Sequence, residues 1–305
     1  MQFLIITSTE DLASMNIRSK YISSDSYSFI ETNVNWQGNT LLKLEEIAFK
    51  PECASFLDEH QIFLGLIDTP LIFFENLGIE NTCLDPDFLI FASRHHSETA
   101  HPAFLAHLTG NWSINTDFGG KAKRLSKASA VLLKSGFKSL KNQLIRNYFK
   151  EFQNFSLDIE VTHHGPTSLQ QPLLFLELGS SKKEWEIKKA GELVSNAIID
   201  TCFNYIDHKE CINIGVGFGG THYAPQFKRL IEDQNTAISF ICPKYYIQEL
   251  SKELIQQMID NTIEKVNCFI IDWKGTNSQD KKHLMPLLEE FEIPIMKAKE
   301  LRHDH

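Results

Sequence analysis

Apolar segments and amphipathic segments alternate along the second half of the chain. Such alternation is typical of a mainly parallel or mixed sheet covered by helices. The alternation therefore predicts the α/β class, with ligands bound beyond the carboxyl ends of strands. Strands are predicted at Leu157–Thr162, Leu173–Leu178, Cys211–Val216, Ala237–Cys242, Cys268–Asp272 and Ile293–Met296, with helices at Lys183–Tyr205, Lys244–Ile259 and near Lys281–Phe291.

The first half of the chain gives a weaker pattern. Strands are predicted at Gln2–Thr7, Phe88–Ala92 and Ala103–Leu108, whereas Tyr21–Glu80 mixes short apolar stretches with Ser-rich and Asn-rich turns. The 305 residues contain no internal repeat and no Pro/Gly-rich linker. We therefore expect a single α/β domain over residues 1–305.

Composition argues against a membrane-spanning, secreted or disulfide-rich protein. The longest apolar runs fall far short of the roughly 20 residues that span a bilayer, and Met1–Thr7 predicts a strand rather than a signal peptide. The six cysteines are scattered without CxxC spacing, so neither a disulfide framework nor a four-cysteine zinc site is expected. We predict a cytoplasmic protein that binds no membrane, and we expect a monomer.

Charge is distributed unevenly along the chain. The formal net charge of −9 argues against indiscriminate coating of nucleic acid and against DNA binding. Nine basic residues and no acidic residue nevertheless lie between Lys121 and Lys150, and apolar residues there recur at helical spacing, at Leu133, Phe137, Leu140, Leu144 and Tyr148. Lys134, Lys138 and Lys141 flank that predicted apolar face, where they can meet RNA phosphates. A solvated helix face is the alternative interpretation.

Histidines gather in three segments that each follow a predicted strand. These are Ser93–Pro102 with His95, His96 and His101, Glu160–Pro166 with His163 and His164, and Gly215–Pro225 with His222. Neighbouring residues of a strand point to opposite faces, so His163 and His164 serve one site only if the turn at Gly165 redirects the chain. A buried loop that uses these histidines for structure is the alternative. We expect the three segments to converge on one edge of the sheet.

The third segment is unusually rich in glycine. It contains a GxGxxG pattern, yet its strand comes late in the chain and His222–Pro225 interrupts the expected helix, so a dinucleotide fingerprint is disfavoured. Glycines let backbone amides approach a phosphate, a ribose or a carbonyl. The substrate-binding residues predicted on this basis are Gly217, Gly219, Gly220, Thr221 and Tyr223. The alternative is a glycine-rich turn with a packed His-Tyr pair.

The number of histidines raises the question of a metal. Seven of them exceed what a structural role requires, namely His95, His96, His101, His107, His163, His164 and His222. Neutral imidazole is the usual ligand of zinc, and a catalytic zinc commonly takes three protein ligands and a water. Glu98, Glu160 and Glu177 are nearby carboxylates that could ligate metal or act as a base. Because the GxSxG signature of a serine nucleophile is absent, hydrolysis by an activated water is favoured over a covalent intermediate.

Three blocks carry a family resemblance: Glu160–Pro166 (EVTHHGP), Phe175–Trp185 (FLELGSSKKEW) and Gly217–Pro225 (GFGGTHYAP). Further blocks, in the same order as in the family, are Asp11–Ile17, Ser93–Ser97, Phe118–Gly120, Pro243–Tyr245 and Asp272–Gly275. Together they strongly resemble the D-aminoacyl-tRNA deacylases of the archaeal and plant type. Gln226 departs from the pattern, since this family tends to carry arginine there, and Tyr21–Glu80 shows no matching block.

The resemblance implies a zinc-dependent esterase that removes D-amino acids from mischarged tRNA, with D-aminoacyl-tRNA as substrate and Zn²⁺ as cofactor. It also implies a three-layer α/β/α sandwich with a mixed, mainly parallel sheet, phosphorylase/hydrolase-like in architecture. Carried over to matching positions, it gives His95, His163, His164 and His222 as the candidate metal ligands. The catalytic residues it implies are His163, His164, His222, Glu160 and Glu177.

Two mechanisms and two other functions remain as alternatives. Zinc held by some of the histidines would polarise the ester carbonyl or activate a water, with Glu160 or Glu177 as base and the amides of Gly219 and Gly220 at the oxyanion. In the second mechanism a tRNA ribose hydroxyl assists the water and the histidines only orient the ester. The other functions are a tRNA- or nucleotide-binding protein without catalysis, and a metallohydrolase of another ester such as peptidyl-tRNA.

Overall fold

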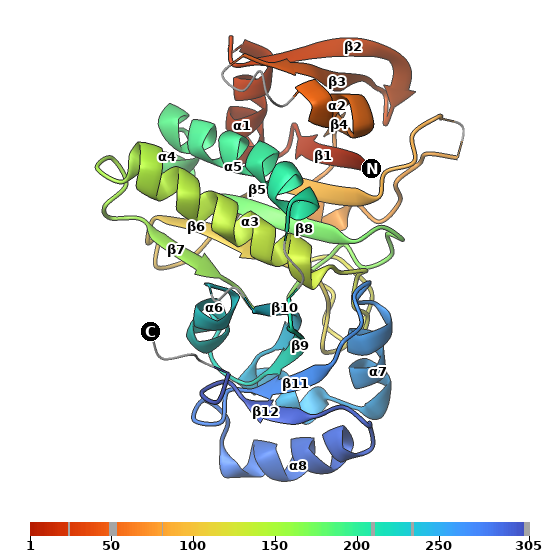
Figure 1. Ribbon diagram of the computed structural model, residues 1–305, viewed down its shortest axis with the longest axis vertical. Coiled ribbons are helices and arrows are strands. Elements are labelled where there is room, and N and C mark those ends of the chain that lie inside the picture. Colours follow the sequence, from red (N-terminus) through yellow and green to blue (C-terminus); the bar gives the residue numbers. More distant parts are fainter. Residues whose placement is uncertain (24, 49–53, 81, 209–210, 233–234, 302–305) are drawn as a thin grey trace.

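A large, mostly parallel β-sheet forms the upper part of the molecule in Figure 1. The computed structural model describes residues 1–305 except residues 24, 49–53, 81, 209–210, 233–234 and 302–305. Within these residues the sheet has eight strands in the order β2-β3-β4-β1-β5-β8-β6-β7. The strands are β1 (Gln2–Ser8), β2 (Tyr27–Trp36), β3 (Asn39–Ile47), β4 (Gln61–Ile67), β5 (Phe88–His96), β6 (Ala103–His107), β7 (Ser156–Ile159) and β8 (Leu173–Ser180).

The direction of the strands changes within this sheet. β4, β1, β5 and β8 run parallel, whereas β6 is antiparallel to β8 and parallel to β7. β2 and β3 form an antiparallel hairpin at the other edge. The central strands are nearly continuous apolar runs because both faces of the sheet are covered. Because β6 runs opposite to β8, the carboxyl end of each of these strands lies beside the amino end of the other.

Helices cover one face of the large sheet. They are α1 (Leu12–Ser23), α2 (Ala54–Glu59), α3 (Ala130–Gln143), α4 (Lys182–Trp185) and α5 (Lys188–Ile206), and α3 and α5 lie side by side across it (Figure 1). The opposite face packs Phe91, Phe175 and Trp36 into a second apolar cluster, which is completed by Leu71 and Phe74 from the turn η2 (Leu71–Phe73) and the residue after it. The site described below opens on this second face.

A smaller sheet follows in the chain and lies at the other end of the molecule (Figure 1). Its strands are all parallel, in the order β10 (Thr236–Cys242), β9 (Asn213–Phe218), β11 (Cys268–Ile271) and β12 (Ile295–Lys297). The helical elements beside it are α6 (Pro225–Glu232), η4 (Lys244–Glu249), α7 (Lys252–Asp260) and α8 (Ser278–Glu289). One buried apolar cluster extends through both sheets, since α3 packs against β10 as well as against β6 and β8.

The predicted α/β class is confirmed: a large, mostly parallel sheet is flanked by helices. The strands divide between two sheets, which alternation alone does not specify, because the pattern says nothing about which strands pair. The expectation of a single domain stays a prediction. Within the described ranges, no helix combines the length and the apolar composition that crossing a membrane requires. Five cysteines among the described residues form no disulfide: Cys83, Cys202, Cys211, Cys242 and Cys268. Cys53 lies outside the described residues.

Several predicted boundaries are wrong for local reasons. The helix predicted at Lys244–Ile259 is two elements, because Ser251 caps a new helix by accepting a hydrogen bond from the amide of Leu254. The basic segment is helical only from Ala130, where Ser129 is the cap, and ends in a π-turn over Leu144–Tyr148. Strand β5 continues to His96, so the first histidines predicted in a loop lie on a strand.

Candidate active site

A cavity of about 780 Å³ brings the three predicted histidine segments together. It opens on the face of the large sheet opposite the helices. Residues from β5, β8, the loops after β6 and β7 and the loop after β9 line it, among them Asp11, Arg94, His95, Asn111, Phe118, His163, His164, Glu177 and His222. The expected convergence therefore occurs, although on a sheet face and not at one edge, because β6 and β7 run opposite to β5 and β8.

Strand register places the first group of site residues on one face. Ser93 pairs with Glu177 and His95 with Gly179 between the parallel strands β5 and β8. His107 on the antiparallel β6 lies opposite Phe175. Paired residues share a face, and so do residues two apart, so His95, Glu177 and His107 project together. Gly179 is required there, because an added Cβ would lie 2.6 Å from the Cβ of His95.

The Glu160–Pro166 segment leaves the sheet and turns both of its histidines into the site. His164 has a positive φ of 46°, which redirects the chain after His163. The two imidazole rings lie 4.4 Å apart, centroid to centroid. The loop is held in place by the indole of Trp112, which donates to the carbonyl of Thr162 at 2.7 Å, and by the amide of Gly110, which donates to that of His164 at 2.8 Å. Both histidines line the same cavity, which is one of the two arrangements that the sequence leaves open.

His222 reaches the site from the loop after a strand of the smaller sheet. It follows β9, and its carbonyl accepts a hydrogen bond from the amide of Val161 at 2.9 Å. Its Nε2 lies 2.8 Å from Glu160 Oε1, and its Nδ1 lies 3.1 Å from the hydroxyl of Tyr245. The ring is therefore oriented from both sides, one partner being a fully buried carboxylate.

Two buried carboxylates sit among the imidazoles. Glu160 and Glu177 lie 3.5 and 3.4 Å from Nδ1 of His95, and Glu177 also lies 3.4 Å from Nε2 of His107. Burial by itself raises the pKa of the Glu177 carboxyl, but His107 and His95 outweigh burial and lower that pKa well below its usual range. Burial likewise lowers the pKa of His95 and of His107, and the carboxylates reverse this, so that both pKa values are raised.

His163 and His164 are held neutral instead. Burial, followed by the neighbouring His107, lowers the pKa of His163 well below its usual value and that of His164 to about 3. Their Nδ1 atoms lie 2.8 and 2.6 Å from the carbonyl oxygens of Val161 and Gly165, so each Nδ1 carries the proton and donates it. Each Nε2 therefore keeps its lone pair. Nδ1 of His107 also donates to a carbonyl, that of Leu108 at 3.2 Å, but the Nε2 of this ring faces the Glu177 carboxylate at 3.4 Å and its pKa is raised.

These features fit a bound divalent cation. Three groups of side chains each bring ligand atoms within 4.8 Å of one another: His107, His163 and His164; Glu160, His163 and His222; and His95, Glu160 and Glu177. Nε2 of His95, Nε2 of His107 and Oε2 of Glu160 are buried without a hydrogen-bond partner within the described part of the chain. Imidazoles that donate Nδ1–H to carbonyls and present Nε2 are the usual arrangement of metal-ligating histidines. Each of the four histidines predicted as ligands belongs to at least one of these groups, and His163 belongs to two.

Comparison with known proteins identifies the family. The model of the D-aminoacyl-tRNA deacylase family matches residues 82–296. The chain belongs to the D-aminoacyl-tRNA deacylase family. It is 34% identical to the D-aminoacyl-tRNA deacylase of Thermococcus onnurineus, over 96% of this chain and 99% of that protein, and 30% identical to that of Pyrococcus furiosus with the same coverage. A crystal structure of a conserved protein of unknown function has a TM-score of 0.80 and 27% identity, and the match covers 99% of this chain and 96% of that one.

His107 belongs to one of the possible metal-binding groups of this deacylase, although the sequence does not predict it as a ligand. It was counted among the seven histidines, but it lies inside a predicted strand, where a lone histidine most often satisfies the core. The register of β6 against β8 decides on which face of the sheet the side chain of His107 lies, and local sequence does not predict that register. The signal that could have found it is its place at the end of a strand beside the other clusters.

The glycine-rich loop of this family member serves packing more than substrate binding. Gly217 is buried in β9 against the ring of Phe227. Gly219 and Gly220 have φ values of +95° and +81°, and a side chain at Gly219 would clash with Thr276. The amide of Gly219 already donates to the carbonyl of Cys242 at 2.8 Å, so the prediction that it meets the oxyanion is wrong.

The remaining two residues predicted in that loop are placed differently. Thr221 is exposed, and Tyr223 is 38% exposed with its ring 6.3 Å from that of His95. Tyr223 therefore stands beside the deacylase site, in reach of a substrate that enters it. Substrate contacts by Thr221 and Tyr223 stay predictions.

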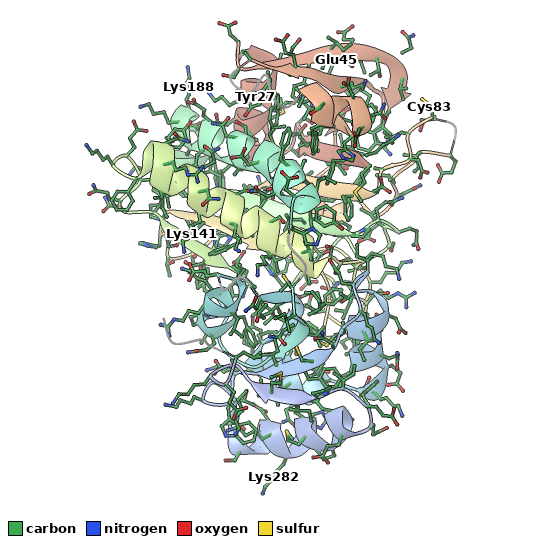
Figure 2. All side chains as sticks on the ribbon, in the orientation of Figure 1. Tyr27, Glu45, Cys83, Lys141, Lys188 and Lys282 are labelled. Atoms are coloured by element: carbon green, nitrogen blue, oxygen red, sulfur yellow. The ribbon has the colours of Figure 1, made fainter. Side chains whose placement is uncertain are left out.

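The lysine row on α3 does not form an open surface. Lys134 is only 6% exposed, and its Nζ donates to the carbonyl of Thr236 at 2.6 Å, so the prediction that it contacts phosphate is wrong. Lys141 projects from α3 (Figure 2) and pairs with Glu232 of α6 at 2.7 Å. Lys138 is half-buried. The two lysines with defined partners fasten α3 to the smaller sheet, and a phosphate contact by Lys138 stays a prediction.

Proposed function

We infer that the chain is a hydrolase that cleaves the ester bond of D-aminoacyl-tRNA and releases free D-amino acid and tRNA. Family membership over most of the chain supports the reaction. The observation that carries its chemistry is the cluster of His107, His163, His164 and His222 with two buried carboxylates, beside a cavity that His163, His164, His222 and Glu177 line. This arrangement supplies neutral imidazoles, a base and a place for a cation.

We propose that His107, His163 and His164 hold the metal through their Nε2 atoms. Three neutral imidazoles are a common protein ligand set of a catalytic zinc, which keeps a further position open. Zinc bound there would supply Lewis-acid polarisation of an ester carbonyl or of a water molecule. The carbonyl of Leu108 orients His107 through Nδ1, whereas Glu177 lies 3.4 Å from the Nε2 that would face the metal and would stand beside the ion, with His95 on the other side of this carboxylate.

His222 is the proposed proton carrier of the reaction. It lines the cavity and its ring lies 4.9 Å from that of His163. Because Nε2 of His222 donates its proton to Glu160, the base is Nδ1, which faces the hydroxyl of Tyr245. When water attacks the ester carbonyl, the proton of the water passes to this Nδ1, and the resulting imidazolium returns it to the ribose oxygen as the ester bond breaks. Glu160 does not line the cavity. It positions His222 through the 2.8 Å contact and stabilises the imidazolium.

A deacylation assay with a chelator separates the two mechanisms that the sequence leaves as alternatives. The purified protein is stripped of metal, and release of amino acid from D-aminoacyl-tRNA is followed before and after zinc is added back. We expect loss and recovery of activity. Full activity in rigorously metal-free protein would leave the ribose hydroxyl of tRNA as the assisting group. His101→Gln is the matched control, because His101 is exposed and lies outside the residues that line the cavity.

The other proposals concern the whole molecule. We propose that the protein acts as a monomer in the cytoplasm and as a single domain. Light scattering coupled to size-exclusion chromatography tests the monomer, and a dimer mass would overturn it.

A further inference from the structure

A second cavity, of about 650 Å³, is lined by several basic side chains. Lys121, Arg124, Lys127 and Lys252 contribute to it, together with the acids Glu253 and Asp260. One short segment joins this basic cavity to the catalytic cavity. Phe118 lines the catalytic cavity, and Lys121 and Arg124, three and six residues later, line the basic one.

The segment that joins the cavities is fastened directly to the catalytic loop. The carbonyl of Phe118 accepts a hydrogen bond from the amide of Gly165 at 3.1 Å, and the amide of Lys121 donates to Thr167 Oγ1 at 2.8 Å. Between them, Gly119 and Gly120 adopt φ values of +78° and +77°. A side chain at Gly119 would clash with the backbone of Ile72. The segment between the histidines and the basic cavity is therefore short, and hydrogen bonds and close packing hold its backbone in place.

Two cations of the basic cavity, unlike Lys127 and Lys252, have no side-chain partner among the described residues. Nζ of Lys127 lies 2.9 Å from Asn261 Oδ1, and Lys252 pairs with Glu290 at 2.7 Å. Both Lys121 and Arg124 are exposed, and no ion pair among the residues that the structure describes involves either of them. These two side chains can therefore meet phosphate oxygens without breaking an existing pair.

Phe118 adds an aromatic surface at the junction. Its side chain is 68% exposed at the mouth of the catalytic cavity. Exposed aromatic rings beside cations are the usual means of binding single-stranded nucleic acid, because bases stack on the ring and phosphates pair with the cations. An aromatic ring near the ester, followed by two cations, matches the order of groups along a single-stranded 3′ end.

We propose that the segment Phe118–Arg124 docks the single-stranded 3′ end of tRNA. A base next to the ester stacks on Phe118, and Lys121 and Arg124 hold the phosphates that precede it. This proposal rests on the proposed function for the identity of the RNA, and it replaces the lysine row of α3 as the main phosphate contact.

The test measures binding of uncharged tRNA, with and without its 3′-terminal nucleotides, at several salt concentrations. Four variants are compared with the wild type: Phe118→Ala, Phe118→Trp, Lys121→Ala/Arg124→Ala, and the control Lys188→Ala/Lys282→Ala. The control removes two exposed charges at opposite ends of the molecule (Figure 2). Thermal unfolding of each variant confirms that it is folded.

We expect Phe118→Ala to weaken binding of intact tRNA about tenfold, in line with the loss of one stacked base, and to leave binding of trimmed tRNA unchanged. Lys121→Ala/Arg124→Ala should reduce the slope of log Kd against log salt by about 1.4, roughly 0.7 for each phosphate contact. Phe118→Trp should bind as the wild type does. A salt slope equal to that of the control, or a Phe118 effect that persists with trimmed tRNA, would overturn the proposal.

The outcome is separable from that of the proposed function. If the wild type releases no amino acid from D-aminoacyl-tRNA but the binding results hold, the docking segment stands and the hydrolytic function falls. If the wild type is active and the variants bind tRNA normally, the docking proposal is rejected and the hydrolytic function is retained. In an active protein the docking variants should raise KM and leave kcat within about twofold, because they touch neither the ester nor the histidines.

Discussion

Glu160 Oε1 lies 2.8 Å from His222 Nε2, and this contact joins the two sheets of the molecule at the active site. Glu160 follows β7 of the large sheet, and His222 follows β9 of the small one. Val161 reinforces the junction by donating its amide to the carbonyl of His222. The catalytic groups therefore come from both sheets, and the site is complete only where the two sheets pack together.

The Glu160–His222 contact predicts strong coupling between the two side chains. His222→Asn should lower kcat by about 10²- to 10⁴-fold, the usual loss for a positioned proton carrier. Glu160→Gln should lower kcat in the same range with little change in KM. The double variant should lower kcat little more than either single variant does, because each single substitution already disrupts the same Glu160–His222 pair. Single-turnover deacylation by the four proteins measures this, and additive losses would show that the two residues act independently.

The three-imidazole group predicts that His107 is a metal ligand. His107→Asn should weaken zinc binding at least about tenfold, and His164→Asn should do the same, whereas His101→Gln should bind zinc as the wild type does. Competition with a chromophoric chelator measures the affinity without reference to activity. Wild-type zinc affinity in the His107 variant would remove this residue from the ligand set and leave the groups around Glu160 as the binding site.

Gly179 predicts a steric effect on the site. In Gly179→Ala the new methyl group would lie 2.6 Å from the Cβ of buried His95, so β5 and β8 must separate locally. Such overpacking costs about 1–3 kcal/mol of the free energy of unfolding. Chemical denaturation measures the loss. A variant as stable as the wild type would mean that the strands adjust without strain, and the account of the His95 position would need revision.

Asp11 predicts a pH dependence of stability. Burial raises the pKa of its carboxyl from 3.8 to about 6, although the amides of Ser14 and Arg94 donate to it. A raised folded-state pKa contributes stability that is fully present below pH 4 and is lost as pH rises through about 6. Asp11→Asn does not titrate, so its stability relative to the wild type should improve between pH 4 and pH 7, by up to about 3 kcal/mol. Urea unfolding at several pH values measures the difference, and a constant difference would contradict the raised pKa.

Sequence alone reached the α/β class, the family and the convergence of three histidine segments, because those depend on periodicity and on local motifs. It could not reach the division into two sheets or the direction of His107, since both depend on which strands pair and in which register. The lysine row on α3 shows the same limit. Helical spacing places Lys134 beside the apolar face, but only the packing of α3 against β10 shows that its ammonium is buried on the carbonyl of Thr236.

The oxyanion contact predicted for Gly219 is wrong for a related reason. A glycine can serve close approach of a ligand or close approach of another part of the chain, and the sequence is the same in both cases. In this molecule the turn after β11 occupies the space beside Gly219 and Gly220, so their conformation serves the packing of two loops.

The most direct test of the central claim is to incubate the purified protein with matched D- and L-aminoacyl-tRNA and to follow release of each amino acid. The account predicts release from the D-aminoacyl ester by the wild type, with a rate at least about 100-fold lower in His222→Asn. Release of neither amino acid would contradict hydrolysis altogether, and equal release by the wild type and by His222→Asn would contradict the assignment of the reaction to this site.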